Sequence, residues 1–244
     1  MKAPPRMAPG GIGSLIPLGL LCVLLLAPGT ALAQTDVQLW TSASLRAELV
    51  EDFRLELTQH LRFDEDVSRV LSIMPELSAS YDPAKPLRLS LGYRFIYERE
   101  QDRQLDDAHR LTFDARLRGD LDPIRISYRL RIQEVFEQKA SGLEVRNTLR
   151  NRLGVSWDTD TPLTPEVSAE IYTRIGGDKA ALFHKLRLTA GASYDIDDVE
   201  LELFYRLELP IDQPLEPVLH IIGLGFRYDL SLVDEEEDEP GSGP

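Results

Sequence analysis

Histidine and serine are the residues of this sequence whose types could carry out hydrolysis. A hydrolase built on a sheet needs a serine, a histidine and an acid on neighbouring strands near one rim. His60 alternates with charged residues and has Ser42 or Ser72 as possible neighbours. No recognisable signature surrounds it, and a hydrogen-bonded structural histidine is the simpler interpretation. We therefore assign no catalytic residue and do not expect an enzyme, and His60 stays the one base worth testing.

The other three histidines offer less chemistry. His184 and His220 share a face with leucines and isoleucines, which predicts boundary positions, and His109 follows the charged segment 98–108. The sequence contains no HExxH, no Gly-rich phosphate loop and no paired Asp-x-Asp calcium loop. It gives no support for metal or nucleotide chemistry, and no cofactor is expected.

The first 33 residues have the pattern of a secretory signal peptide. Lys2 and Arg6 supply positive charge, an apolar run follows from Leu15 to Leu26, and Ala31 and Ala33 are small residues at the cleavage positions. The apolar run is shorter than the ~20 residues that a transmembrane helix needs. Residues 1–33 are therefore expected to direct export and to be removed after Ala33.

Cleavage would leave a chain without cysteine and with a strong negative charge. Cys22, the only cysteine, lies in the leader, so disulfides and thiolate chemistry are excluded from the exported chain. Loss of Lys2 and Arg6 leaves 25 basic and 41 acidic residues, a net charge of −16. Nucleic acid is not an expected partner for such a protein. Six acids form the run at 234–239, and residues 234–244 are expected to be a disordered acidic tail.

Alternation of apolar and polar residues dominates the sequence from Val37 onward. This period of two is typical of strands, whose successive side chains face opposite sides of a sheet. Turn residues such as Asp82-Pro83 and Gly176-Gly177 separate the alternating segments, and no segment has the period of a helix. The expected strands are 37–47, 53–63, 71–81, 87–98, 110–118, 124–133, 143–157, 163–174, 182–194, 199–209 and 218–230.

Alternation fits both a soluble barrel with an apolar interior and a membrane barrel with an apolar exterior. Segments of 11 to 15 residues would reach ~36–50 Å, enough to cross the apolar band of a bilayer at the usual tilt. Strands of soluble proteins are typically about half as long. The length therefore favours an all-β, antiparallel, up-and-down transmembrane β-barrel of ten to twelve strands, formed by residues 34–233.

The polar face of these segments carries dense, mixed charge, which suits a wet or ion-paired lumen. The solvated exterior of a soluble barrel is the alternative for the same residues. The candidates for the lumen are Arg54, Glu56, His60, Arg116, Arg129 and Arg150.

Aromatic residues on the apolar face gather at strand ends. Tyr81, Trp157 and Tyr194 each precede a short turn that begins with aspartate, and Tyr228 lies near the end of the last segment. Tyrosine and tryptophan favour the boundary between membrane and water, so these four are expected interface aromatics. The last segment also resembles the aromatic-ended strand that barrel assembly machinery recognises.

Several segments together resemble a family of uncharacterised bacterial barrel proteins, DUF2490. The resemblance begins at Leu39-Trp40, continues through 53–66, 77–83 and 87–99, and includes the HRL of His109 to Leu111. It covers nearly the whole exported chain. The resemblance implies a β-barrel in the outer membrane of Gram-negative bacteria and brings no catalytic residue with it.

The strand count raises a conflict. Short turns after the third, fifth, seventh and ninth segments are expected to be periplasmic, and the longer connections extracellular. Eleven strands would then start on the extracellular side, although an exported chain starts in the periplasm and bacterial barrels normally have an even number of strands. We therefore expect twelve strands, or ten if the first segment does not join the barrel.

Three functions remain open at this stage. The first is a narrow pore or a structural barrel with a crowded charged lumen, surrounded by outer-membrane lipid. The second is a membrane-embedded enzyme that modifies lipid or lipopolysaccharide. The third is a soluble periplasmic barrel that binds a ligand in an apolar pocket.

Overall fold

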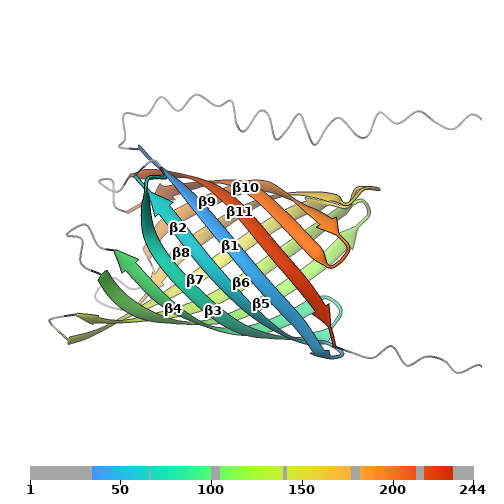
Figure 1. Ribbon diagram of the computed structural model, residues 1–244, viewed down its shortest axis with the longest axis horizontal. Coiled ribbons are helices and arrows are strands. Elements are labelled where there is room, and N and C mark those ends of the chain that lie inside the picture. Colours follow the sequence, from blue (N-terminus) through green and yellow to red (C-terminus); the bar gives the residue numbers. More distant parts are fainter. Residues whose placement is uncertain are drawn as a thin grey trace, which may run out of the picture. The chain divides into compact units, whose positions relative to one another are not determined.

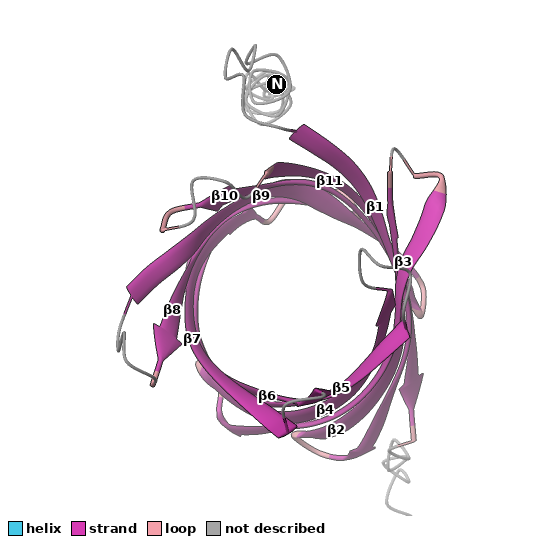
Figure 2. Ribbon diagram, turned by 90° about the vertical axis from the view of Figure 1, so that its left-hand side faces the viewer, coloured by secondary structure: helices cyan, strands magenta, loops and turns pink. Residues whose placement is uncertain are grey.

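A closed β-barrel is the whole of the described structure. The computed structural model describes residues 35–65, 67–99, 105–139, 142–176, 182–212 and 217–232. Figure 2 shows the strands as a ring seen from one end. The strands are β1 Thr35–Val50, β2 Phe53–Asp64, β3 Arg69–Ala84, β4 Leu87–Arg99, β5 Leu105–Leu121, β6 Ile124–Lys139, β7 Gly142–Trp157, β8 Leu163–Ile175, β9 Leu182–Ile196, β10 Val199–Pro210 and β11 Val218–Ser231.

The expected all-β barrel is confirmed, and each of the eleven alternating segments lies within a strand. The strands have 12 to 17 residues, because the alternation continues past most of the expected bounds. No helix of the described residues is long and apolar enough to cross a membrane. The leader 1–33 and the tail 234–244 lie outside the described residues, so both assignments stay predictions.

The expected range of ten to twelve strands is confirmed, and the expectation of an even number within it, twelve or ten, is wrong, because eleven strands close the barrel. Consecutive strands pair antiparallel, so the first and last strands of an odd-numbered barrel must run the same way. β1 and β11 do pair in parallel, from Thr35 opposite Val218 to Glu48 opposite Ser231 (Figure 1). The parity argument failed because it assumed an antiparallel closing pair.

The two ends of the barrel have different connections. At one end, the turn end, four of the five connections have two residues, at 51–52, 85–86, 122–123 and 197–198. At the other, the loop end, the longest connections are 176–181 and 211–217. The asymmetry is incomplete. The loop-end connection between β6 and β7 also has two residues, whereas the fifth turn-end connection, at 158–162, has five.

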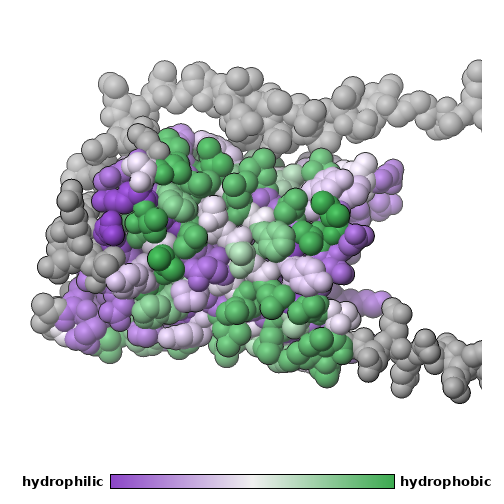
Figure 3. Space-filling view, viewed as in Figure 1, coloured by the Kyte–Doolittle hydropathy of each residue, from purple (hydrophilic) through white to green (hydrophobic). Residues whose placement is uncertain are grey.

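The apolar face of the strands points outward. Leu57 of β2 and Leu77 of β3 are directly opposed, and they are 55% and 53% exposed. Figure 3 shows hydrophobic residues spread over the outer surface of the strands, with hydrophilic residues toward both ends. Only four buried apolar residues form a cluster inside, Met74, Ile96, Ala108 and Val135 of β3 to β6. The core of a soluble protein is thus replaced by a polar interior.

Candidate functional site

The interior of the barrel contains two adjoining cavities. The loop-end cavity has a volume of about 740 Å³ and the turn-end cavity about 730 Å³. Inward side chains from all eleven strands line each of them, and Arg131, Arg152 and Arg227 line both. The inward positions are those that alternate with the exposed apolar residues, so the period-two pattern alone determines which side chains reach the cavities.

The lining of these cavities is strongly basic. Among the described residues, 19 arginine or lysine side chains and nine carboxylates line the two cavities. The whole chain, in contrast, has a net charge of −14. The acids are therefore concentrated elsewhere, including the run at 234–239 and the ends of the barrel. An interior of this sign favours anions over cations.

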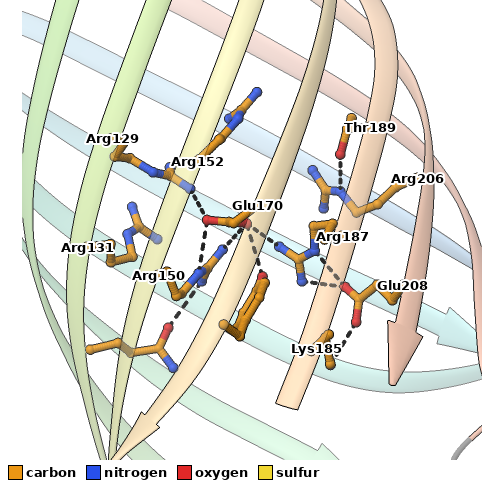
Figure 4. A network of polar contacts seen from close by, with 12 residues as sticks. Arg129, Arg131, Arg150, Arg152, Glu170, Lys185, Arg187, Thr189, Arg206 and Glu208 are labelled. Carbon is orange, nitrogen blue, oxygen red and sulfur yellow. Dashed lines mark hydrogen bonds and ion pairs between the residues drawn. The ribbon is translucent and has the colours of Figure 1, made fainter. Parts of the chain in front are cut away.

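Glu170 of β8 is at the centre of the densest network of ion pairs (Figure 4). Its carboxylate accepts hydrogen bonds from Arg129 Nη2 at 2.7 Å, from Arg150 Nη2 at 2.8 Å and from Arg187 Nη1 at 3.3 Å. The Tyr172 hydroxyl donates a further hydrogen bond at 3.1 Å. Three guanidinium groups from β6, β7 and β9 thus converge on one buried carboxylate, which keeps it ionised and fixes all three arginines.

Glu208 of β10 extends the network toward the loop end. Its carboxylate accepts hydrogen bonds from Lys185 Nζ at 2.8 Å and from Arg187 Nε at 2.8 Å. Glu208 itself is 3% exposed. Arg187 therefore joins the carboxylates of two strands, and the network spans β6 to β10 without an apolar side chain between its members.

Charge is distributed unevenly around the interior. The four consecutive strands β4 to β7, here called the basic wall, contribute 11 of the basic lining residues and two carboxylates, Glu98 and Asp114. The other seven strands, here called the mixed wall, contribute eight basic residues and seven carboxylates. Excess positive charge thus lies on one side of the lumen.

Aromatic rings hold further arginines on the mixed wall. The guanidinium of Arg62 lies 3.8 Å from the ring centre of Trp40, and that of Arg206 lies 5.2 Å from it. Arg206 also lies over Phe204 at 4.3 Å. Cation–π contacts of this kind are stronger where water is excluded. Trp40 is paired with Gly223 of β11 across the parallel closing pair, and the ring of Phe204 fills the space beside that glycine.

The structure places the six side chains expected in the lumen on the inward face. Arg129 and Arg150 meet at Glu170, as described above. Arg54 lies at the turn end and donates to Asp82 Oδ2 at 2.7 Å, and Glu56 accepts from Arg46 Nη2 at 3.0 Å. Arg116 lines the turn-end cavity and His60 the loop-end cavity. The six therefore do not converge on one site, although Arg116 is directly opposite Arg129.

His60 is not part of a nucleophile–base pair. Its Nε2 lies 3.1 Å from Arg94 Nη2 and 3.7 Å from Glu76 Oε2. Within the described residues, neither Ser42 nor Ser72 forms a hydrogen bond with it, although Ser42 is its direct neighbour across β1 and β2. A serine nucleophile needs a base within hydrogen-bond reach, so this geometry does not assemble a hydrolase site.

The alternation in the sequence predicted the wrong face for one histidine, His184. His184 was expected among apolar residues, but it lines the loop-end cavity, and its ring lies 5.9 Å from that of Tyr172. The pairing of β8 and β9 shifts register beside it, between Tyr172 and Thr173. Such an irregularity reverses the alternation locally, which periodicity cannot show.

Two histidines pair with tyrosines of neighbouring strands. His220 Nδ1 lies 2.6 Å from the Tyr205 hydroxyl, and His109 Nδ1 lies 2.7 Å from the Tyr93 hydroxyl. The side chain of His109 therefore has a partner on β4. His109 and His220 lie near the loop end of their strands, and the two tyrosines lie in the middle of theirs.

The four expected interface aromatics lie at the turn end on the outer face. Tyr81, Tyr194 and Tyr228 are 52%, 43% and 37% exposed, and Trp157 is half-buried. They come from β3, β9, β11 and β7, which all end at the turn end. Their contact with a membrane boundary stays a prediction.

Sequence reasoning did not single out Glu170, Asp82, Arg187 or Trp40. Glu170, Arg187 and Trp40 occupy the polar phase of their expected strands, so alternation alone assigns them to the interior. Asp82 was expected in a turn, and the structure places it in β3, which continues to Ala84. The meeting of Glu170 with Arg129 requires the order of β6, β7 and β8, which alternation does not give. No group of three or more histidine, cysteine, aspartate or glutamate side chains that could hold a metal ion occurs in the described part of the chain.

The fold and its interior define a class, a closed all-β barrel whose apolar face is outward and whose interior is charged. Residues 37–209, more than half of the chain, match the family model described as a protein of unknown function, DUF2490. The chain belongs to this family, which confirms the resemblance. No curated protein matches the chain.

Proposed function

We propose that this protein is an outer-membrane β-barrel whose charged lumen is a narrow pore with a preference for anions. The outward apolar face is the observation that carries the proposal. Of the described residues, 38 large hydrophobic side chains are exposed, whereas only seven apolar residues are buried. Soluble monomers rarely expose contiguous apolar patches above a few hundred Å². Outer-membrane lipid is a partner that fits this exterior.

The length of the strands supports a spanning position. Strands of 12 to 17 residues reach ~40–56 Å, more than the ~25 Å apolar band of an outer-membrane barrel even when tilted. The outward phase of β11 ends in Phe226, Tyr228 and Leu230, and we propose that the barrel assembly machinery recognises this end. Aromatic rings at the turn end suit the boundary of that band.

Fractionation tests the location. Retention in detergent-extracted outer membranes, with a gel mobility that changes on heating, is expected of a folded membrane barrel. Recovery in the aqueous phase without detergent would overturn the proposal and favour the soluble alternative. That alternative needs an apolar pocket, whereas the cavities of the described barrel are lined mainly by charged residues.

The orientation can be tested with single cysteines. We propose that the turn end faces the periplasm, so the two-residue turns at 51–52 and 197–198 are inaccessible from outside the cell. Asp52→Cys and Asp197→Cys are useful because the only native cysteine is Cys22. A membrane-impermeant maleimide should label them in broken cells only. Labelling in intact cells would show that the turn end faces the outside of the cell instead.

Conductance separates a pore from a structural barrel closed by its own ion pairs. The folded protein in a planar lipid bilayer is expected to give small channels whose reversal potential in a salt gradient shows anion preference, because of the excess of 19 basic over nine acidic lining residues. If the folded protein gives no current, a pore is excluded and a structural barrel is the proposed function that stays. A cation preference would contradict the electrostatic argument. No geometry described above favours the lipid-modifying enzyme.

A further inference from the structure

Four arginines stand side by side across the basic wall. Arg88 of β4 is directly opposite Arg116 of β5, Arg116 is opposite Arg129 of β6, and Arg129 is opposite Arg152 of β7. Directly opposed residues have Cβ atoms ~5 Å apart, and like charges at such positions are destabilising. We call these four residues the arginine row. A row of like charges on four consecutive strands is expected only where counter-charges are supplied.

The protein supplies counter-charges mainly to the ends of the row. Arg88 donates to Asp82 at 2.6 and 2.7 Å, and Arg152 donates to Glu166. In the middle, Arg129 uses only Nη2 on Glu170, and its buried Nε has no partner. Arg116 forms no hydrogen bond or ion pair with the residues that the structure describes. The charged groups that act on it most strongly are three cations, Arg118, Arg152 and Arg88, and one carboxylate, Asp114.

The middle of the row also has free space beside it. Arg116 lines the turn-end cavity and Arg129 the loop-end cavity, so the pair lies where the two cavities adjoin. Toward the turn end, the inward positions next to Arg129 and Arg152 are small, with Ser127 directly opposite Gly154, whereas the position next to Arg116 is Arg118. A β-carbon on Gly154 would lie 2.8 Å from Ser127 Oγ. The space beside Gly154 is therefore filled by the Ser127 side chain, and Arg116 and Arg129 reach the lumen through the two cavities that they line.

We propose that Arg116 and Arg129 form a binding site for a phosphate-type oxyanion. A guanidinium presents its N–H donors in a planar fork that matches the oxygens of phosphate, and charge-assisted hydrogen bonds of this kind are strong. Arg116 offers its whole fork, and Arg129 adds its positive charge and a buried Nε that has no partner in the described protein. Arg88 and Arg152 flank the pair, each already held by one carboxylate. A bound dianion would neutralise the like charges that the row brings together.

The site rests on the proposed function only in requiring that the lumen be open to water. It does not require that ions cross the barrel. Phosphate could enter as the free ion or as a phosphorylated small molecule, and both present the same oxygens to Arg116 and Arg129. Inorganic phosphate is therefore the probe, and glucose 6-phosphate distinguishes a site that also admits a phosphorylated solute.

Calorimetric titration of the barrel folded in octyl glucoside tests the site. Inorganic phosphate should bind at a ratio near one, at an ionic strength held constant with sodium chloride so that diffuse attraction is screened. Arg116→Gln is expected to weaken binding at least about tenfold. Arg206→Gln is the matched control, since Arg206 is inward, has no carboxylate partner among the described residues and lies on the mixed wall. It should bind phosphate like the parent chain.

Each result supports or overturns the site. No binding by the parent chain, or equal weakening by Arg116→Gln and Arg206→Gln, would overturn it. Heat-modifiable gel mobility shows whether each variant is folded. Should Arg116→Gln not fold, Arg116→Lys keeps the charge without the fork and should still weaken binding, and unchanged binding would overturn the site. If the barrel binds phosphate but conducts no current, the binding site is supported and the pore is excluded. If it conducts current but binds no phosphate, only the binding site is excluded.

Discussion

The basic wall and the mixed wall neutralise their charges in different ways. On the mixed wall, eight basic residues face seven carboxylates, and cations alternate with anions in register, as in Glu170 opposite Arg187 and Arg187 opposite Glu208. On the basic wall, eleven arginines have only two carboxylates beside them in the lining, and arginine is opposite arginine. Most of these arginines pair with carboxylates outside that lining set, such as Glu137 of β6 and Glu170 of the mixed wall, whereas Arg116 has no partner among the described residues.

This difference separates stability from binding within one lumen. A buried ion pair that loses one partner leaves an uncompensated charge, which is strongly destabilising. An arginine among like charges has no such pair to lose, and its removal relieves repulsion. Substitutions of a charge that has a partner and of a charge that has none should therefore have opposite effects, which unfolding experiments in lipid vesicles can measure.

Glu170→Gln should have the largest effect. It leaves Arg129, Arg150 and Arg187 without their shared carboxylate, and we expect it to lower the free energy of unfolding by about 3–5 kcal/mol. Urea unfolding followed by tryptophan fluorescence measures it. Glu202→Gln is the control, since Glu202 lines the same cavities with no ion pair among the described residues, and should cost less than about 1 kcal/mol. Equal losses would contradict a special role of the network.

A pair of arginine variants compares the two kinds of environment directly. Arg150→Gln removes hydrogen bonds to Glu170 and Gln133 and should cost about 2–3 kcal/mol. Arg116→Gln should leave the free energy of unfolding unchanged or raise it by up to about 1 kcal/mol in phosphate-free buffer. Both changes remove one positive charge, so equal destabilisation would show that Arg116 has a structural partner after all.

Glycine variants test packing on the two walls and should have the smallest effects. An added β-carbon at Gly223 would lie 1.9 Å from the ring of Phe204, so Gly223→Ala should cost about 1–2 kcal/mol. At Gly154, next to the arginine row, the nearest atoms are the ends of the Ser127 and Glu166 side chains. These can move, and Gly154→Ala should cost less than Gly223→Ala. The reverse order would show that the basic wall is the more tightly packed of the two.

Alternation was sufficient to predict the strands and the two faces, since all eleven segments and the six expected inward residues follow from the period of two. It failed at His184, where the register shift between β8 and β9 turns the side chain into the lumen. It also failed on closure, because the direction in which β1 meets β11 depends on the number of strands that fit around the barrel. Neither the register shift at His184 nor the direction of the closing pair changes the local alternation of apolar and polar residues in the sequence.

The sequence by itself determined that the chain forms a barrel with charged residues on one face, because a strand exposes alternate residues whatever its neighbours are. It could not determine which charges meet. Glu170 and Arg129 are 41 residues apart, and Arg116 and Arg129 become neighbours only through the register of β5 and β6. Tertiary structure alone decided that Glu170 binds arginines of both walls and that the basic wall presents a row of arginines, because register and strand order set the distances between charges.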